Sequence, residues 1–414
     1  MEFKVVKSIE EFVKLRQEWD DLSARNGERN FYLTYDWFYC VLTLSQDFSS
    51  DIYTIIVQKG KELIGIIPCC IRRRRFRLFD HRSLEIVGNI YSPYRGGVIL
   101  KGWEVEVAHG LWKFLTTDFS RYWDLLVFED LSPKDAFVQS LVAVVKEKRL
   151  RNWQSEQYVN VVTDLSHVSD SEEYFKKLSK SHRQNIRTGF NRMVREGEIE
   201  ILAIGGGQES LDIGLRHYHE VYEKSWKEDE LDQNFHPGLA KYTMEKNWLR
   251  LFILYFRPIK GRDFGIGSDG RFQSYSVSPL NRDVTTDEYI PIAANLFLAY
   301  ENHAYYLKTA YLQDFAKYSA GTVLFWYSAK YLIDRDKCSD IDHQKGDETY
   351  KLKWGEVNET RFRFVVANPE SIRGNIEVFS EVCAIPVLRD LRKKLRVAKT
   401  APTSVELRSG SGLN

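Results

Sequence analysis

The stretch Tyr289–Thr322 reads YIPIAANLFLAYENHAYYLKTAYLQDFAKYSAGT and carries the clearest structural pattern of this 414-residue chain. Two apolar runs, Tyr289–Tyr300 and Ala304–Leu312, are separated by a short polar turn, which predicts a β-hairpin. A loop over 314–320 follows, and the apolar residues of 321–333 recur at helical spacing. This order of hairpin, loop and helix predicts a mixed α/β fold rather than an all-helical or all-strand fold.

The alternation continues upstream and downstream of this stretch. The spacing of apolar residues predicts a long helix over 172–195, ended by Gly197, and a further helix over 211–226. Apolar runs predict strands over 198–204 and 249–256, and a short strand over 339–343. These elements together describe one α/β lobe.

The first part of the chain repeats this organisation. Asp51–Gln58 and Leu63–Cys70 flank a Gly-containing turn and predict a hairpin. Helices over 104–116 and 133–146 enclose a strand over 123–128. The predicted fold class is therefore α/β with mixed sheets, arranged as two lobes with a cleft between them.

A chain of this length suits two domains. We place an N-terminal lobe at 1–163, a polar linker at 164–171 and a C-terminal lobe at 172–368. The remainder, 369–414, ends in a Ser-, Gly- and Pro-rich segment and is predicted to be a partly disordered extension. The segment 257–288 is rich in Gly, Ser and Asp, shows no clear period and is assigned no element.

Composition narrows the function classes. The 59 basic and 58 acidic residues nearly balance, whereas a protein that binds nucleic acid with its whole surface is usually clearly basic. No CxxC pair is present, so no metal site is predicted. Neither a secretory h-region nor an apolar run of membrane-spanning length is visible, which favours a cytoplasmic protein. The five cysteines are irregularly spaced: Cys40, Cys69, Cys70, Cys338 and Cys383.

A basic helix is the first candidate site. Within 172–195 the positions Lys180, Arg183 and Arg187 recur every three or four residues and share one helix face. Unmixed positive charge along one face suits an anionic ligand, although a solvated face is an equally simple reading. The basic residues of this helix, uninterrupted by acids, are Lys176, Lys177, Lys180, Arg183, Arg187, Arg192 and Arg195.

The start of the helix over 321–333 is the second candidate. A helix N-terminus presents free N–H groups and a positive dipole, and small residues let the backbone approach a phosphate. A plain strand–helix turn with Ser319 as N-cap would explain the same residues. The predicted cofactor-binding residues are Lys317, Ser319, Ala320, Gly321 and Thr322.

Acidic, basic and imidazole groups cluster over 340–351, at the end of a short strand. Strand ends beside a helix-bound ligand are common sites of chemistry in α/β folds. His343 could relay a proton, and Asp342 could orient it or act as the base. A polar surface turn is the alternative reading. A fourth feature, Arg72–Arg75 extended by Arg77, could touch anionic lipid or glycan, or could guard an exposed strand edge by charge.

Taken together, these motifs resemble the GNAT acyltransferase superfamily, in its CelD-like branch. Tyr174–Arg187 resembles the entry to that family's domain, and Tyr318-Ser319-Ala320-Gly321 stands where the family usually has Tyr-Ser-Pro-Gly. The closing motif of the family is similar to Asp342 with Gly346-Asp347 and Tyr350-Lys351. A comparable closing lysine, here Lys351, occurs in the distantly similar Fem-type peptidyl transferases.

The resemblance implies two tandem GNAT-like lobes and transfer of an acyl group from acyl-CoA, acetyl-CoA above all, to an amine or hydroxyl. It implies catalytic roles for Asp342, His343 and Lys351. The acceptor would be a small molecule or a precursor of an envelope or exopolysaccharide glycan, with peripheral membrane or polysaccharide-assembly proteins as partners. The alternatives are a Fem-type transferase that uses aminoacyl-tRNA and a non-catalytic glycan-binding protein on the same fold.

Overall fold

The computed structural model confirms the hairpin and helix that decide the fold. β10 (Ile290–Tyr300) pairs antiparallel with β11 (His303–Tyr311), α10 (Ala320–Asp334) follows, and β12 (Asp340–Lys345) returns parallel to β11. The structure describes residues 1–46, 51–76, 79–205, 208–225, 227, 230–258 and 289–384. The predictions made for 259–288, 385–414 and Arg77 lie outside these residues.

The first lobe alternates strands and helices as predicted. Its elements in chain order are β1 (Glu2–Val6), α1 (Ile9–Lys14), α2 (Arg16–Asn26), η1 (Phe31–Leu33), α3 (Tyr35–Leu44), β2 (Asp51–Lys59), β3 (Glu62–Phe76), β4 (Phe79–Ile86), β5 (Val98–Ile99), α4 (Glu104–Thr116), η2 (Ser120–Tyr122), β6 (Leu125–Leu131), α5 (Ala136–Glu147) and β7 (Asn152–Asp164).

The second lobe begins after a short polar connection at 165–170. Its further elements are α6 (Ser171–Lys177), α7 (Lys180–Glu196), β8 (Gly197–Ile204), α8 (Gln208–Glu223), α9 (Phe235–Met244), β9 (Leu249–Pro258), η3 (Gln313–Tyr318), η4 (Lys351–Lys353), β13 (Glu356–Ala367), α11 (Ile372–Phe379) and η5 (Ser380–Ala384).

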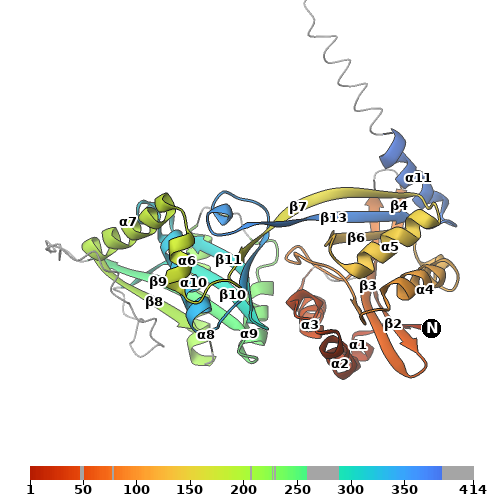
Figure 1. The fold of residues 1–414 in the computed structure, drawn as a ribbon, viewed down its shortest axis with the longest axis horizontal. Coiled ribbons are helices and arrows are strands. Elements are labelled where there is room, and N and C mark those ends of the chain that lie inside the picture. Colours follow the sequence, from red (N-terminus) through yellow and green to blue (C-terminus); the bar gives the residue numbers. More distant parts are fainter. Residues whose placement is uncertain are drawn as a thin grey trace, which may run out of the picture.

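The two lobes share one continuous sheet and exchange their last strands. The strand order is β1-β2-β3-β4-β6-β13-β7-β12-β11-β10-β9-β8. β7 follows the first lobe in sequence but pairs with β12 of the second, whereas β13 follows the second lobe but pairs with β6 of the first. β7 and β13 also pair with each other and bridge the lobes as two long neighbouring strands (Figure 1). In space, therefore, the lobes do not follow the boundaries drawn at 163 and 368.

Aromatic packing holds the lobes together on the η1 side. Phe31 lies edge-on to Tyr300, with ring centroids 5.8 Å apart, and to Trp248 at 6.0 Å. Its backbone N–H donates to the Tyr305 hydroxyl at 3.1 Å. These rings are part of one apolar core that runs from the first lobe into β9–β11. The space between the lobes is therefore framed by a packed contact, which makes its shape a property of the folded chain.

One local prediction was wrong. The long helix is two helices, because Leu178 leaves the helical conformation and Ser179 caps α7 by accepting from the His182 N–H. The Arg72–Arg75 run lies inside β3 and pairs with β4, whereas the pairing of β3 with β2 ends at Ile71, which agrees with the predicted charged strand edge. The extension after 368 begins with an ordered helix, α11, N-capped by Ser371.

Candidate active site

The parallel strands β11 and β12 separate shortly after they meet. Their pairing covers only three positions, from His303 opposite Asp340 to Tyr305 opposite Asp342. β11 continues to Tyr311, so its outer half has no β12 partner. Two cavities open beyond this point, and both are lined by Lys227, Tyr306, Thr309 and Tyr350.

The first of these, called here the helix cavity, reaches the start of α10. It has a volume of about 260 Å³ and is lined by Ser319, Gly321 and Thr322. Ser319 does not cap the helix: its backbone is left-handed, with φ of 53°, and its hydroxyl donates to Asn185 Oδ1 at 3.0 Å. The first-turn N–H groups of α10 have no intrahelical acceptor, so they are available to an anion in the cavity.

α7 fixes the position of this helix start. A Cβ on Gly189 would lie 2.3 Å from the Tyr318 carbonyl oxygen, so only glycine lets α7 approach so closely. A Cβ on Gly321 would lie 3.1 Å from the Tyr311 ring, which leaves room for hydrogen alone without a shift. The small residues around Ser319 thus serve close packing and keep the cavity open.

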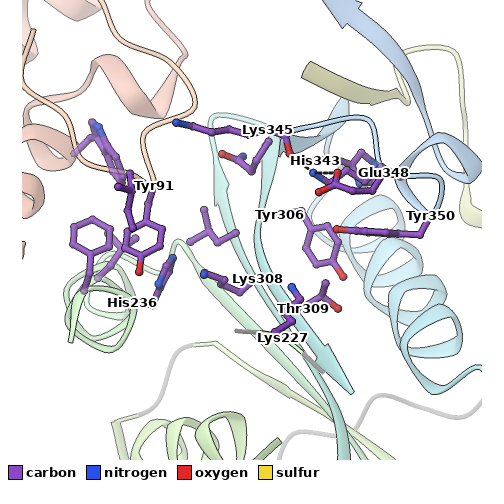
Figure 2. A pocket seen from close by; sticks show the side chains of 17 residues that line it. Tyr91, Lys227, His236, Tyr306, Lys308, Thr309, His343, Lys345, Glu348 and Tyr350 are labelled. Atoms are coloured by element: carbon purple, nitrogen blue, oxygen red, sulfur yellow. Dashed lines mark hydrogen bonds and ion pairs between the residues drawn. The ribbon is translucent and has the colours of Figure 1, made fainter. Parts of the chain in front are cut away.

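The second cavity, called here the interlobe cavity, lies between the lobes and has a volume of about 220 Å³. Figure 2 shows Tyr91 of the first lobe and His236 of α9 on one side, and His343, Glu348 and Tyr350 on the other. Aromatic rings and basic side chains dominate its wall. Its lysines are Lys227, Lys308, Lys345 and Lys351.

Two of these lysines differ in their surroundings. Lys308 forms an ion pair with Glu230 at 3.0 Å. Burial alone would raise the pKa of Glu230, but the hydrogen bond and charge of His236, together with Lys308, hold it at about 2. Burial, reinforced by repulsion from Lys308 and Lys351, lowers the pKa of Lys227 to about 8. Lys227 lines both cavities, so it is a basic group at their junction that changes charge near neutral pH.

His343 is the predicted catalytic residue whose position fits the cavity best. It is buried, lines the interlobe cavity and lies against the rings of Tyr306 and Phe325. Its Nε2 lies 2.8 Å from the hydroxyl of Thr163, which itself donates to the Trp354 carbonyl. Thr163 therefore accepts a hydrogen bond from the Nε2–H of His343, and the lone pair of the neutral ring is on Nδ1. Nδ1 has no hydrogen-bond partner among the described residues.

The pKa of His343 agrees with a neutral ring. Burial lowers it to about 3, and the charge of Lys351 acts in the same direction. The imidazole is therefore uncharged at physiological pH, and Nδ1 can accept a proton or a hydrogen bond.

The other two predicted catalytic residues have structural partners. Asp342 faces β7, where its Oδ1 accepts from Asn160 Nδ2 at 2.8 Å and from the Gln344 N–H at 2.7 Å. Burial raises its pKa, and the residues described along either cavity do not include it. Lys351 does line the interlobe cavity, buried, where it pairs with Glu348 at 2.8 Å and donates to the Lys345 carbonyl.

The predicted basic helix face is not brought to the cavities. Lys180 and Arg187 are exposed, and Arg187 lies over the Phe175 ring. Arg183 donates to the carbonyl oxygens of Lys176 and Leu178, where α6 ends. Lys317 is exposed and pairs with Glu196 at 3.3 Å. Of the predicted cofactor residues, Ser319, Gly321 and Thr322 line the helix cavity, while Ala320 is buried beneath them.

Sequence reasoning missed several residues of the site. Lys227 and Glu230 follow α8 without a pattern, and Tyr91 and His236 come from segments assigned no element. Their part in the site becomes visible only from their positions in the folded structure. Tyr306 lies in the second strand of the predicted hairpin. An aromatic residue in a strand is usually a core residue, so the sequence did not mark it as part of a site. Within the described residues no cluster of His, Cys, Asp and Glu fits a metal ion.

Comparison with known proteins agrees with this geometry. Residues 284–352 match the model of an acetyltransferase (GNAT) domain, a range that includes α10, β12 and the described part of the hairpin. The crystal structure of FemX superposes with a TM-score of 0.54 at 12% identity, over 91% of this chain and 100% of that one. No curated protein sequence matches the chain. The predicted two-lobed α/β fold is confirmed, and residues 284–352 are similar to an acetyltransferase (GNAT) domain.

Weaker similarities extend to other two-lobed proteins. A tandem GNAT protein from the clavulanic acid biosynthesis pathway aligns at 11% identity and a TM-score of 0.48, over 88% of this chain and 98% of that one. L-PGS from Bacillus licheniformis aligns at 11% identity and a TM-score of 0.45, over 88% and 96% of the two chains. No helix in the described part of the chain is long and apolar enough to cross a membrane.

Proposed function

We propose that the protein transfers an acyl group from an acyl-CoA, acetyl-CoA above all, to an amine or hydroxyl of a small acceptor. The observation that carries the proposal is the pair of cavities that meet where β11 and β12 separate. One of them ends at the uncapped start of α10, which suits a pyrophosphate, and the other is lined by lysines and aromatic rings of both lobes. A donor and an acceptor can thus meet at Tyr306 and Thr309.

The reaction needs little chemistry from the protein beyond positioning and one proton transfer. The acceptor nitrogen or oxygen attacks the thioester carbonyl, the new bond to carbon forms and the carbon–sulfur bond breaks. The acceptor loses a proton, and the departing thiolate takes one up. Holding both reactants in adjoining cavities supplies several kcal/mol, on the order of 7 in favourable cases.

His343 is the side chain best placed to take the acceptor proton. Its Nδ1 carries a lone pair within the wall of the interlobe cavity, and Thr163 fixes the tautomer. We expect His343→Gln to lower the release of CoA from acetyl-CoA with a small amine by about 10²-fold or more. Asp342→Asn is the matched control, since Asp342 faces away from the cavity. Equal losses in the two variants would contradict the assignment to His343.

The lysines of the interlobe cavity support an acceptor that carries negative charge. The residues that line this cavity include four lysines, Lys227, Lys308, Lys345 and Lys351, and one carboxylate, that of Glu348. A precursor of an envelope or exopolysaccharide glycan would satisfy this requirement when it carries a carboxylate or phosphate. Under this proposal the protein works with acceptors supplied by glycan assembly in the cytoplasm.

Calorimetric titration with acetyl-CoA, longer acyl-CoAs and free CoA, at two salt concentrations, tests the donor. We expect binding that Gly321→Asp weakens by at least about tenfold, because its side chain meets the Tyr311 ring and its charge repels phosphate. Gly60→Asp is the matched control: it adds the same charge in the β2–β3 turn, where a Cβ meets nothing within 4 Å, and its melting temperature reports the backbone strain at the left-handed φ of 61°.

The outcomes of this titration separate the functions. Binding that Gly321→Asp weakens and Gly60→Asp leaves intact supports an acyl-CoA transferase. Absence of binding to every CoA compound overturns the proposal, and charged tRNA is then the donor to titrate. Binding that neither variant changes would remove the helix cavity from the donor site.

A further inference from the structure

A corner of the first lobe carries an apolar surface unrelated to either cavity. α11 buries Gly374, Glu377 and Val378 against β6 and β13, where a Cβ on Gly374 would meet the Asp124 carbonyl at 2.2 Å. The opposite side of the helix is exposed and apolar. Ile372 is 78% exposed and Phe379 is 53% exposed. α11 lies at the far end of the first lobe from the second lobe (Figure 1).

The exposed residues of α11 form one face. Ile372, Ile376 and Phe379 follow one another at intervals of four and three residues, so they project from the same side of the helix. Phe79 at the start of β4 contacts α11 from the side of Glu377: its N–H donates to the Glu377 carboxylate at 3.1 Å, and its side chain is 37% exposed. We call Phe79, Ile372, Ile376 and Phe379 the corner patch.

Positive charge surrounds the corner patch. Arg373 donates from its guanidinium to the Asp80 carbonyl, and Arg151 donates to the Asn375 carbonyl, which places both beside α11. Arg75 pairs across the strands with Asp80 and is exposed. The arginine run of β3 therefore ends at the rim of an apolar surface.

The sequence that follows α11 adds more charge of the same sign. Between 385 and 400 there is one acidic residue, Asp390, among six basic ones. The basic residues of this segment are Arg389, Arg392, Lys393, Lys394, Arg396 and Lys399. Exposed apolar side chains on one helix face beside such positive charge match the requirements of an anionic bilayer surface, which accepts apolar side chains between its headgroups and attracts cations.

We propose that the corner patch docks this protein onto an anionic membrane surface as a peripheral protein. Ile372, Ile376 and Phe379 enter the boundary between headgroups and acyl chains, and Arg75, Arg151 and Arg373 contact lipid phosphates. The arrangement favours a bilayer over a protein groove because exposed guanidinium groups from three separate segments, those of Arg75, Arg151 and Arg373, lie beside the apolar face of α11. This proposal is independent of the reaction at the cavities.

Sedimentation of the full-length protein with phosphatidylcholine vesicles, with or without phosphatidylglycerol, tests the proposal. We expect binding to the vesicles that contain phosphatidylglycerol and weaker binding as salt rises. Ile376→Glu with Phe379→Glu should weaken it by about tenfold or more, because both carboxylates would have to enter the bilayer boundary. Arg75→Gln with Arg373→Gln should weaken it by a smaller factor, about fivefold or more.

The matched control is Val13→Glu with Val105→Glu, which places the same two charges at exposed apolar positions of α1 and α4, 45% and 56% exposed. Its vesicle binding should stay near that of the wild type, and the melting temperature of each variant reports folding. Absence of wild-type binding overturns the proposal. Equal binding by Ile376→Glu with Phe379→Glu and by the control, Val13→Glu with Val105→Glu, overturns it as well. A dimer that only Ile376→Glu with Phe379→Glu dissociates would assign the corner patch to a second copy of the chain instead.

Discussion

The two lobes differ at the same topological position, the parallel strand pair that follows a hairpin. In each lobe an antiparallel hairpin is followed by a strand that runs parallel to the hairpin's second strand: β4 with β6, and β11 with β12. Each parallel pairing covers three positions. In the second lobe the strands then part around the two cavities. In the first lobe a buried arginine fills the corresponding place.

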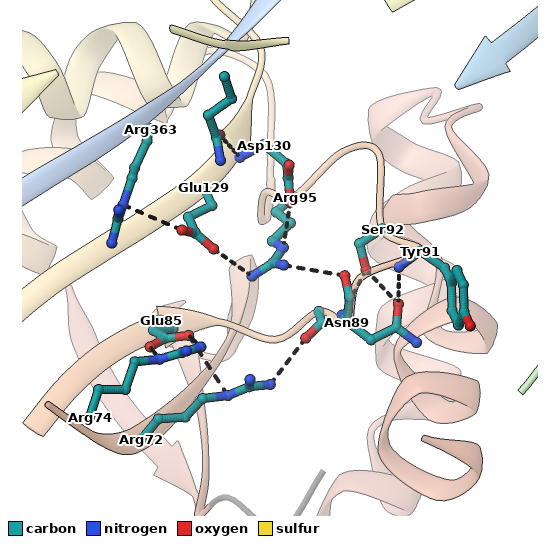
Figure 3. Close-up of polar contacts among 12 residues, drawn as sticks. Arg72, Arg74, Glu85, Asn89, Tyr91, Ser92, Arg95, Glu129, Asp130 and Arg363 are labelled. Atoms are coloured by element: carbon teal, nitrogen blue, oxygen red, sulfur yellow. Dashed lines mark hydrogen bonds and ion pairs between the residues drawn. The ribbon is translucent and has the colours of Figure 1, made fainter. Parts of the chain in front are cut away.

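Arg95 is that residue, 8% exposed, with its Nε 2.9 Å from Asp130 and its guanidinium donating to the Asn89 carbonyl at 3.3 Å. Gly88 makes room for it, since a Cβ there would lie 2.5 Å from the guanidinium. Figure 3 shows Arg95 between Glu129 and Asn89, in contact with Asp130. Two small residues, Ser319 and Gly321, occupy the start of α10 in the second lobe and line the helix cavity.

The comparison teaches that the first lobe supports the site rather than repeating it. Asp130 pairs with Arg95 and, at 3.3 Å, with Lys345 of the interlobe cavity. The arginine that closes one lobe thus holds the carboxylate that positions a lysine of the other. Cavities therefore lie beside the β11–β12 pair, whereas the buried ion pair of Arg95 lies beside the β4–β6 pair.

The largest expected effect comes from removing Arg95, beside the β4–β6 pair of the first lobe. Arg95→Ala leaves the buried carboxylate of Asp130 without its main partner, so we expect a loss of about 3 kcal/mol in the free energy of unfolding. Urea denaturation measures it. Arg73→Ala, at an exposed position of β3, should cost less than about 0.5 kcal/mol. Similar values for the two variants would show that Arg95 does not support the first lobe.

A second prediction concerns the helix cavity beside the β11–β12 pair. Gly189→Ala places a methyl group against the Tyr318 carbonyl, so α7 and the start of α10 must move apart. We expect a loss of about 1–3 kcal/mol of stability together with weaker donor binding. Gly110→Ala on α4 is the matched control, since its Cβ meets only side chains of Phe3 and Met1. If Gly189→Ala leaves donor affinity unchanged, the position of α7 does not affect binding in the helix cavity.

A third prediction uses the buried histidine of β12. The folded pKa of His343 is depressed to about 3, below the ordinary value of 6.5. Its contribution is therefore fully present above pH 6.5 and is lost as the pH falls towards 3, because the unfolded chain binds the proton first. Between about pH 7 and about pH 5 the loss is on the order of 2 kcal/mol.

His343→Asn should flatten this dependence. Denaturation of both proteins at several pH values between neutral and acidic gives the difference in slope, which does not require the variant to be as stable as the wild type. Parallel slopes would show that His343 is already charged in the folded protein. That result would also remove it as a proton acceptor.

The smallest effect is expected on the basic helix face. Arg183→Ala with Arg187→Ala removes contacts to the end of α6 and to the Phe175 ring, which should cost at most about 1 kcal/mol. Because neither side chain lines a cavity, donor affinity should stay unchanged in calorimetry. A clear loss of affinity would restore the basic face to the binding site.

The sequence by itself determined the local elements and the small residues at the start of α10. Both hairpins, α10 and β12 follow from apolar periodicity and turn residues, which act over a few neighbouring positions. Ser319 and Gly321 could be chosen in advance, because small residues at a helix start have a local meaning. The break at Leu178 and the helix α11 are also local features. The sequence analysis missed the break because the basic run continues across it, and it missed α11 because the apolar periodicity there is weak.

Only the tertiary structure decided how the lobes share strands and which polar residues face a cavity. β7 and β13 pair across some two hundred residues of sequence, and no local pattern specifies such a register. Asp342 and His343 are neighbours in sequence, yet they point to opposite faces of β12, and packing by Thr163 and Asn160 selects which one meets the cavity. Lys227, Tyr91 and His236 converge only when both lobes are folded, because a cavity is a property of elements that are distant in the chain.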